Sequence, residues 1–167
     1  MSDYLFKTKR LGFKYLEKED LDYLMLLDSD SDVRQFFPDG VATKEQISKR
    51  FNEFMSYHKK LGLPVFVLFD VETSEFVGRA GFTPIHSGEI EVVYAFHKRY
   101  WGQGLATETL AALLKWAKKN IKSNYIIAYT VSEHIASQRV MEKCGMKFYK
   151  KDAVKGVECR FYQVKNK

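Results

Sequence analysis

The segment from residue 88 to residue 132 constrains the fold more than any other part of this chain. It begins with "GEIEVVYAF", an apolar run with the pattern of a strand. "GQGLATETLAALLKWAKKNI" follows and predicts a long helix, with Leu110, Leu113 and Leu114 on one apolar stripe. "NYIIAYTVS" then predicts a second strand. Two strands joined through a helix form a crossover unit, so this segment predicts a sheet that a helix covers.

Segments on both sides of this unit extend the sheet and cover it. Before it, the pattern predicts a strand at 6–16, a helix at 17–37 that breaks around Ser29–Asp32, a helix at 43–62, and strands at 64–71 and 74–85. After it, a helix at 135–145 precedes strands at 146–151 and 158–164. Hairpins at both ends and a crossover between them predict an α/β fold with a mixed central sheet of about six to seven strands. The whole chain, 1–167, is expected to form one domain.

Composition narrows the class of protein further. The chain is 46% apolar and 15% aromatic, which excludes a disordered protein. It has no apolar run long enough to span a membrane and no N-terminal export signal, so we expect a cytoplasmic protein with no membrane partner. Cys144 and Cys159 stand apart from each other and from any histidine at ligand spacing, which predicts reduced thiols and no metal site.

The glycines at the start of the long helix predict an anion site. Arg99-x-x-Gly102-x-Gly104 precedes a helix expected to begin at about Gln103. A helix N-terminus carries unpaired amide N–H groups and partial positive charge, and glycine lets a bulky anion approach them. The alternative is a tight turn that needs glycine for its own geometry. The dinucleotide fingerprint does not fit, because Thr107 stands where its third glycine would be.

Three blocks of this chain resemble the GNAT superfamily of N-acetyltransferases. "YAFHKRYWGQGLATETL" resembles its acyl-CoA-binding motif, and "EHIASQRVMEKCGMKF" resembles the segment that follows it in the family. "KTKRLGFKYLEKEDLDYLMLL" resembles the opening of the ribosomal-protein N-terminal acetyltransferases, the alanine acetyltransferase branch included. The blocks lie in family order and span nearly the whole chain, so the resemblance implies the GNAT fold and acetyl transfer from acetyl-CoA to a primary amine.

The resemblance also implies where acetyl-CoA binds. In the family, two central strands splay apart and the pantetheine arm lies between them; the pyrophosphate rests on the glycine turn. The residues that match are Val93, Tyr94, Ala95 and Phe96 for pantetheine, Trp101, Gly102, Gln103, Gly104, Leu105 and Ala106 for pyrophosphate, and Arg99, Lys143, His134 and Ser137 for further contacts. Arg99 would add charge at the pyrophosphate, and Lys143 is either a phosphate contact or a solvated lysine.

Three positions depart from the family pattern. His134 stands in place of an asparagine, Met146 in place of a phenylalanine, and Met141 in place of the tyrosine that protonates the leaving thiolate in many members. The tyrosine's role therefore cannot be assigned by resemblance. Ser137 matches a serine that can donate a hydrogen bond to the thiolate, although a serine in the first turn of a helix can instead bond to the backbone.

The pKa of the acceptor amine indicates what kind of general base is needed, and aromatic residues of the N-terminal helices are candidates for the acceptor pocket. An α-amine has a pKa of about 7.7–8.0 and needs only a modest base. Glu91 is the first candidate for a catalytic base, with Glu89 and His86 as competitors, and all three can also be solvated groups at strand ends. Phe36 and Phe37, with Tyr57, are expected to form pocket walls, although aromatic residues at helical spacing also belong to cores.

The acceptor remains open at this stage. A protein N-terminus or a small-molecule amine fits the branch that the N-terminal block resembles. A polyamine or an aminoglycoside-type amine is the alternative, and the acidic run from Asp28 to Asp32 could bind its charges. An acyl-CoA-binding domain without catalysis is a further alternative. A basic RNA-binding module would explain the net charge of +6, but no RNA-binding signature is present, so nucleic acid is disfavoured. A homodimer is left open.

Overall fold

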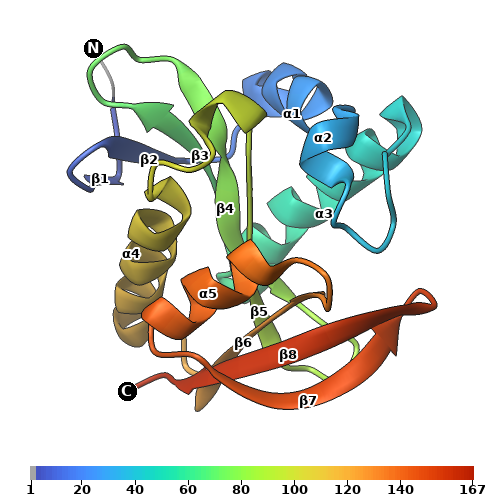
Figure 1. Cartoon of the computed structure of the whole chain (residues 1–167). Helices are drawn as coiled ribbons and strands as arrows, with labels where there is room; N and C mark the ends of the chain where they lie inside the picture. The colour runs from blue at the N-terminus through green and yellow to red at the C-terminus, as the bar shows by residue number, and fades with distance from the viewer. Residues whose placement is uncertain (1–2) are drawn as a thin grey trace.

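The computed structural model describes residues 3–167, which form one mixed sheet with helices on both faces (Figure 1). The strands are β1 (Phe6–Lys7), β2 (Leu11–Tyr15), β3 (Val65–Asp70), β4 (Phe76–Pro84), β5 (Ile90–Phe96), β6 (Tyr125–Val131), β7 (Lys147–Val154) and β8 (Val157–Lys165). Their order in the sheet is β1-β2-β3-β4-β5-β6-β8-β7. Every neighbouring pair in this order is antiparallel except β5 with β6, which the crossover through α4 makes parallel.

The helices divide between the two faces of the sheet. They are η1 (Lys18–Asp20), α1 (Leu21–Asp28), α2 (Ser31–Arg34), α3 (Lys44–Leu61), η2 (Lys98–Tyr100), α4 (Leu105–Asn120) and α5 (Ile135–Lys143). Figure 1 shows α4 and α5 on one side of the central strands and α1, α2 and α3 on the other. None of the helices within residues 3–167 combines the length and the apolar character that crossing a membrane requires.

Strand β3 shows how this division follows from the sequence. It is buried along nearly its whole length, as a strand covered on both faces must be. Phe66 and Leu68 pack into the core beneath α4, whereas Val65 and Val67 pack into the core beneath α1 and α3. The alternation of side chains along one strand therefore places both cores on the same backbone.

The ends of α3 confirm the predicted capping. Thr43 Oγ1 accepts a hydrogen bond from the Gln46 amide at 3.2 Å, and Gln46 Oε1 accepts one from the Thr43 amide at 2.9 Å. Gly62 ends the helix with φ +68°, a left-handed conformation that glycine adopts without a Cβ clash. The helix therefore begins and ends where the sequence indicated.

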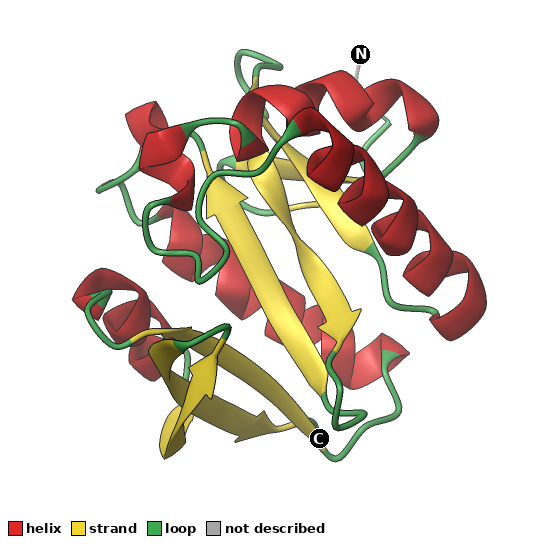
Figure 2. Ribbon diagram, turned by 90° about the vertical axis from the view of Figure 1, so that its right-hand side faces the viewer, coloured by secondary structure: helices red, strands yellow, loops and turns green. Residues whose placement is uncertain are grey.

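The sheet splits between β5 and β6. These strands pair only where Glu91 lies opposite Ile127. On its other side, β5 pairs with β4 from Ile90 to Phe96. Within the described part of the chain, the β6 side of β5 therefore has no strand partner beyond Glu91. Figure 2 shows the strands on the two sides of this split turning away from each other.

Three local predictions need correction. The sheet has eight strands rather than six to seven, because the single strand expected at 6–16 is a β1–β2 hairpin whose turn is closed by a 2.8 Å bond from the Thr8 amide to the Leu11 carbonyl. The helix expected at 17–37 is η1, α1 and α2, with the break near Ser29 as predicted. Helix α4 begins at Leu105 rather than at about Gln103, because Gly104 has φ +81° and cannot be part of the helix.

Gly78 in β4 is required by a close approach to β5. A Cβ added there would collide with the Ala95 carbonyl oxygen and lie 2.9 Å from the Phe96 Cα, both of which are backbone atoms. We expect Gly78→Ala to lower the free energy of unfolding by about 1–3 kcal/mol, measured by urea denaturation. Gly12→Ala in β2 is the comparison, because the three atoms nearest to its Cβ belong to the Tyr4 side chain, which can move, rather than to a neighbouring backbone. Equal losses for the two variants would contradict this account.

Candidate active site

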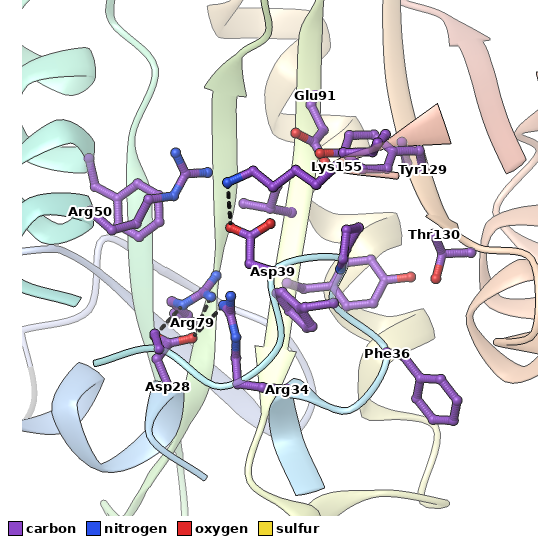
Figure 3. Close-up of a pocket in the computed structure, with 18 of the residues that line it drawn as sticks. Asp28, Arg34, Phe36, Asp39, Arg50, Arg79, Glu91, Tyr129, Thr130 and Lys155 are labelled. Carbon is purple, nitrogen blue, oxygen red and sulfur yellow. Dashed lines mark hydrogen bonds and ion pairs between the residues drawn. The ribbon is translucent and has the colours of Figure 1, made fainter. Parts of the chain in front are cut away.

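A cavity of about 770 Å³ lies beside the split in the sheet, a volume typical of small-molecule sites (Figure 3). Its walls come from both halves of the sheet and from helices on both faces. The residues that line it include Glu91, Val93 and Tyr94 of β5, Tyr129 and Thr130 of β6, His134 and Ser137 at the start of α5, and Asp28, Arg34, Phe36, Phe37 and Arg79 of the N-terminal half. The cavity thus joins the predicted pantetheine strand to the predicted acceptor walls.

The glycine turn leads from β5 into α4. Gly102 has φ +73° and Gly104 has φ +81°, so the turn does need glycine for its own geometry. The turn from Trp101 to Gly104 is exposed, and no side chain caps the first amides of α4 among the described residues. A left-handed turn and an uncapped helix N-terminus occur together here, so the two explanations offered by the sequence are compatible.

Arg10 holds the turn from the β1–β2 loop. Its Nη1 donates to the Gln103 carbonyl at 2.7 Å, and its Nε donates to Glu108 Oε1 at 2.8 Å. Partial burial raises the pKa of Glu108, but hydrogen bonds from Thr8 and Arg10 outweigh it and keep that pKa below its usual range. The sequence did not indicate Arg10, because 98 residues separate it from Glu108 along the chain.

The remaining predicted phosphate contacts lie at the surface. Arg99 donates through Nη2 to Glu75 Oε2 at 3.1 Å and to the Tyr100 hydroxyl at 2.8 Å. Lys143 is exposed near the C-terminal end of α5. That end approaches the first turn of α4, where the Cys144 thiol lies 3.6 Å from the Thr107 carbonyl. Both cations are therefore close in the fold to the glycine turn, but neither lines the cavity.

Of the four β5 residues predicted to contact pantetheine, Val93 and Tyr94 line the cavity, whereas Ala95 and Phe96 do not. Ala95 and Phe96 are buried, as is Leu105 at the start of α4, while Ala106 is half-buried. The indole of Trp101 donates to the Phe96 carbonyl at 2.9 Å. Trp101 therefore anchors the turn to the end of β5.

Two hydroxyl groups meet at the split. The Tyr94 hydroxyl of β5 and Ser137 Oγ of α5 are 3.1 Å apart. Burial raises the pKa of Tyr94 to about 12, so its phenol stays protonated near neutral pH. Met141, which replaces the family tyrosine, lines the same cavity. The sequence indicated Tyr94 only for its backbone, since no motif pairs a strand residue with a helix residue 43 positions away.

His134 and Phe36 form the wall beside this pair. Their rings stack at 4.1 Å with an interplanar angle of 11°. His134 Nδ1 lies 3.3 Å from Thr130 Oγ1, and burial lowers the pKa of the imidazole. His134 is therefore a neutral side chain at the start of α5, next to the position predicted for pantetheine. Phe36 also lines the cavity.

Of the three candidate bases, only Glu91 lines the cavity. Its side chain is buried, and Thr83 Oγ1 donates to its Oε1 at 3.5 Å. Burial raises the pKa of Glu91 to about 8, although Arg50, Thr83 and Arg79 act in the opposite direction. Glu89 instead accepts a 2.7 Å bond from Ser87, and His86 is exposed. Across residues 3–167, the His, Cys, Asp and Glu side chains nowhere gather in threes as metal ligands would.

The acceptor side of the cavity contains a buried charge cluster. Arg79 donates to both oxygens of Asp28, at 2.7 and 3.0 Å, and Arg34 donates to the same carboxylate at 3.3 Å. Phe37 lies under the Arg34 guanidinium, with 4.2 Å between the charge centre and the ring centroid. Phe37 is therefore both a cavity wall and a support for the arginine. Tyr57 does not line the cavity; it packs against the core on the α4 side.

Comparison with known proteins identifies the family. Residues 10–147 match the family model described as "Acetyltransferase (GNAT) domain". The chain is 31% identical over 156 residues to the Bacillus subtilis protein called "Uncharacterized N-acetyltransferase YnaD", covering 90% of this chain and 89% of that protein. The chain therefore belongs to the GNAT acetyltransferase family and is an acetyl-CoA-dependent N-acetyltransferase.

Two solved structures show how widely this fold is used. A ribosomal L7/L12 alpha-N-protein acetyltransferase (RimL) in complex with CoA is 15% identical, with a TM-score of 0.79 and 95% of each chain covered. A spermidine N-acetyltransferase from Vibrio cholerae in complex with CoA and spermine is 14% identical, with a TM-score of 0.77 and coverage of 95% of this chain and 97% of that one. At these identities the similarity shows the fold alone.

Proposed function

We propose that this chain transfers the acetyl group of acetyl-CoA to a primary amine by direct attack within one ternary complex. The observation that carries the proposal is the free edge of β5. It runs from the exposed glycine turn, past Phe96 and Tyr94, and into the cavity that holds Glu91. A donor with a phosphate end and a long amide-containing arm can bond to both features at once.

Each part of the donor has a physical partner in this arrangement. The pyrophosphate would lie on the uncapped amides at the start of α4, between Trp101 and Ala106, with Arg99 and Lys143 adding positive charge. The pantetheine amides would pair with the backbone from Val93 to Phe96. The arm would thereby give this part of β5 the hydrogen-bond partner that β6 does not provide. His134 and Ser137 would flank this arm from α5.

The chemistry then needs one base and one acid. Glu91 in its carboxylate form takes a proton from the acceptor amine, whose nitrogen attacks the thioester carbonyl. A β5 backbone N–H, at Val93 or nearby, stabilises the negative charge that develops on the carbonyl oxygen. The C–N bond forms and the C–S bond breaks. The Tyr94–Ser137 pair gives a proton to the departing thiolate and regains one from water, and Glu91 releases the proton of the amine to water.

Catalysis, rather than acyl-CoA binding alone, is favoured by the environment of Glu91. A carboxyl group with a pKa of about 8 can exchange protons near neutral pH, and structural carboxylates are normally held well below that value. Its position in the cavity, on the strand that would hold the thioester, gives this exchange a use. For the acceptor, a protein N-terminus or a small amine are both compatible with the cavity.

The glycine turn can be tested by donor binding. We expect Gly104→Val to weaken acetyl-CoA affinity by about tenfold or more, ~1.4 kcal/mol, in isothermal titration calorimetry. A β-branched residue is strained at φ +81°, and the distorted turn would no longer present its amides. Gly88→Val is the control, because Gly88 has φ +88° with open space around it but lies in the β4–β5 turn. Unchanged affinity in a folded Gly104→Val protein would refute this site.

The role of Glu91 can be tested by thiol release from acetyl-CoA as a function of pH. Because only the carboxylate is a base, kcat/KM should rise with pH up to about 8 and then level off. Glu91→Gln should lower kcat/KM by about 10²–10⁴-fold. Assays with two acceptors of different amine pKa separate the ionisation of the enzyme from that of the substrate. The rise of kcat/KM that Glu91 causes should occur at the same pH with both acceptors. Glu89→Gln is the control; a limb that survives in Glu91→Gln would exclude Glu91 as the base.

The proton donor can be tested by removing one oxygen atom. Tyr94→Phe keeps the ring and should lower kcat by about 100-fold, while the acetyl-CoA dissociation constant stays the same. The reason is that a thiolate leaves more slowly without a nearby hydroxyl donor. Tyr125→Phe, at an exposed position of β6, is the matched control. A Tyr94→Phe variant with normal kcat would show that Ser137 or water suffices.

A further inference from the structure

The acceptor side of the cavity contains more buried positive charge than its own carboxylate balances. Arg34 is 8% exposed, Arg79 is 3% exposed and Asp28, which both arginines contact, is 5% exposed. Two guanidinium groups therefore share one carboxylate. A buried charge without a full partner is costly, which makes this cluster a place where an additional negative group would be stabilised.

The other carboxyl groups of the cavity offset this charge only in part, because Asp39 attracts Arg34 through space but makes its hydrogen bond to Lys155. Asp39 is paired with Lys155 at 3.2 Å, and Glu53 with Arg50 at 3.3 Å. Glu91 has a pKa of about 8 and is mostly protonated at neutral pH. Lys49 also lines the cavity. The charged side chains that line the cavity therefore carry a net positive charge, and the buried Arg34–Arg79–Asp28 cluster is itself positive.

The two guanidinium groups keep N–H groups for another partner. Arg34 uses Nε on the Gly40 carbonyl at 2.9 Å and Nη1 on Asp28, whereas Arg79 uses Nε and Nη2 on Asp28. Arg34 Nη2 and Arg79 Nη1 have no hydrogen-bond partner among the described residues, and both side chains line the cavity. Figure 3 shows the two guanidinium groups side by side against Asp28. Planar N–H donors held in this way suit an anionic oxygen group.

We propose that the acceptor of this enzyme is an amine that also carries an anionic oxygen group, a carboxylate or a phosphate, which Arg34 and Arg79 bind. The inference rests on the proposed function and specifies its substrate class. Phe37, under Arg34, and Phe54, 5.5 Å from the Arg79 charge centre, hold the arginines in place. The pair is therefore ordered before the ligand arrives, which lowers the entropy cost of binding.

The same observations oppose a polyamine acceptor. The acidic run Asp28–Asp32 would have to bind its charges, but Asp28 is already neutralised by two arginines. Asp30 caps α2 by accepting the Asp32 amide at 2.9 Å, and Asp32 pairs with Lys98 at 3.4 Å. The carboxylates that the sequence offered to a polycation are therefore engaged within the protein.

The test compares matched acceptors in the thiol-release assay with acetyl-CoA. One series contains the common L-amino acids, their C-terminal amides and the corresponding amines without the carboxyl group. A second pair, 2-aminoethyl phosphate and ethanolamine, distinguishes phosphate from carboxylate, and spermidine represents the polycations. We expect kcat/KM to be highest for one of the anionic acceptors. The amine of an amide is less basic than that of the amino acid, so a larger fraction of it is unprotonated and reactive at neutral pH. A preference for the amino acid would therefore have to come from recognition of its carboxylate.

The variant Arg34→Gln assigns the effect to the cluster. It should lower kcat/KM for the anionic acceptor by about tenfold or more and leave the neutral amide within about twofold, with the KM for acetyl-CoA unchanged. Lys59→Gln is the matched control, because Lys59 is an exposed cation of α3 that does not line the cavity. Arg34→Lys, which keeps the charge, serves if Arg34→Gln does not fold, and should weaken the anionic acceptor more than the amide.

Two results would overturn the inference. Neutral amides or spermidine could be acetylated as well as every anionic acceptor by the unmodified enzyme. Alternatively, Arg34→Gln could affect charged and neutral acceptors equally. In either case acetyl-CoA turnover would leave the proposed function intact. Failure of that function would look different: acetyl-CoA would not bind, or none of these amines would release its thiol.

Discussion

The arrangement of this molecule depends on the single point at which its two half-sheets are joined, the pairing of Glu91 with Ile127. At that point the sheet is continuous, and from Val92 onward the β6 side of β5 is a free edge in the described chain. The crossover through α4 requires β5 and β6 to be neighbours, yet the strands diverge immediately. A free strand edge inside a protein needs another partner for its backbone groups. In the proposed complex the donor's amide-containing arm supplies this partner, so the split that weakens the sheet would also create the binding site.

Glu91 takes part both in the pairing that joins the half-sheets and in the cavity beside it. It is the one position at which β5 pairs with β6 in the described chain, and it lines the cavity that lies next to this pair. Its burial, which follows from its place between two half-sheets, is also the cause of its raised pKa. The electrostatic property that makes it a candidate base therefore arises from the topology, without a dedicated neighbouring charge.

Most helices and strands could be predicted from the sequence, because hydrophobic periodicity and capping residues depend only on neighbouring positions in the chain. The end positions of α3, the crossover and the mixed sheet are confirmed for this reason. The sequence missed the division of 6–16 into two strands, since that depends on a turn whose bonds no periodicity reveals. The glycine turn and Ser137 could be located by motif. Arg10, the Tyr94 hydroxyl and the arginine pair around Asp28 could not, since each owes its position to contacts between distant segments. Arg79 lies 51 residues from Asp28, in the interior of an apolar strand.

The ion pair between Lys155 and Asp39 has a consequence for access to the cavity. It connects the tip of the β7–β8 hairpin to the loop after α2, from opposite sides of the split, and the side chains of Lys155 and Asp39 are 65% and 48% exposed. Exposed pairs of this kind contribute about 0–1 kcal/mol and are weakened by salt. Both residues line the cavity, so this contact between its two walls is weak and should loosen as ionic strength rises.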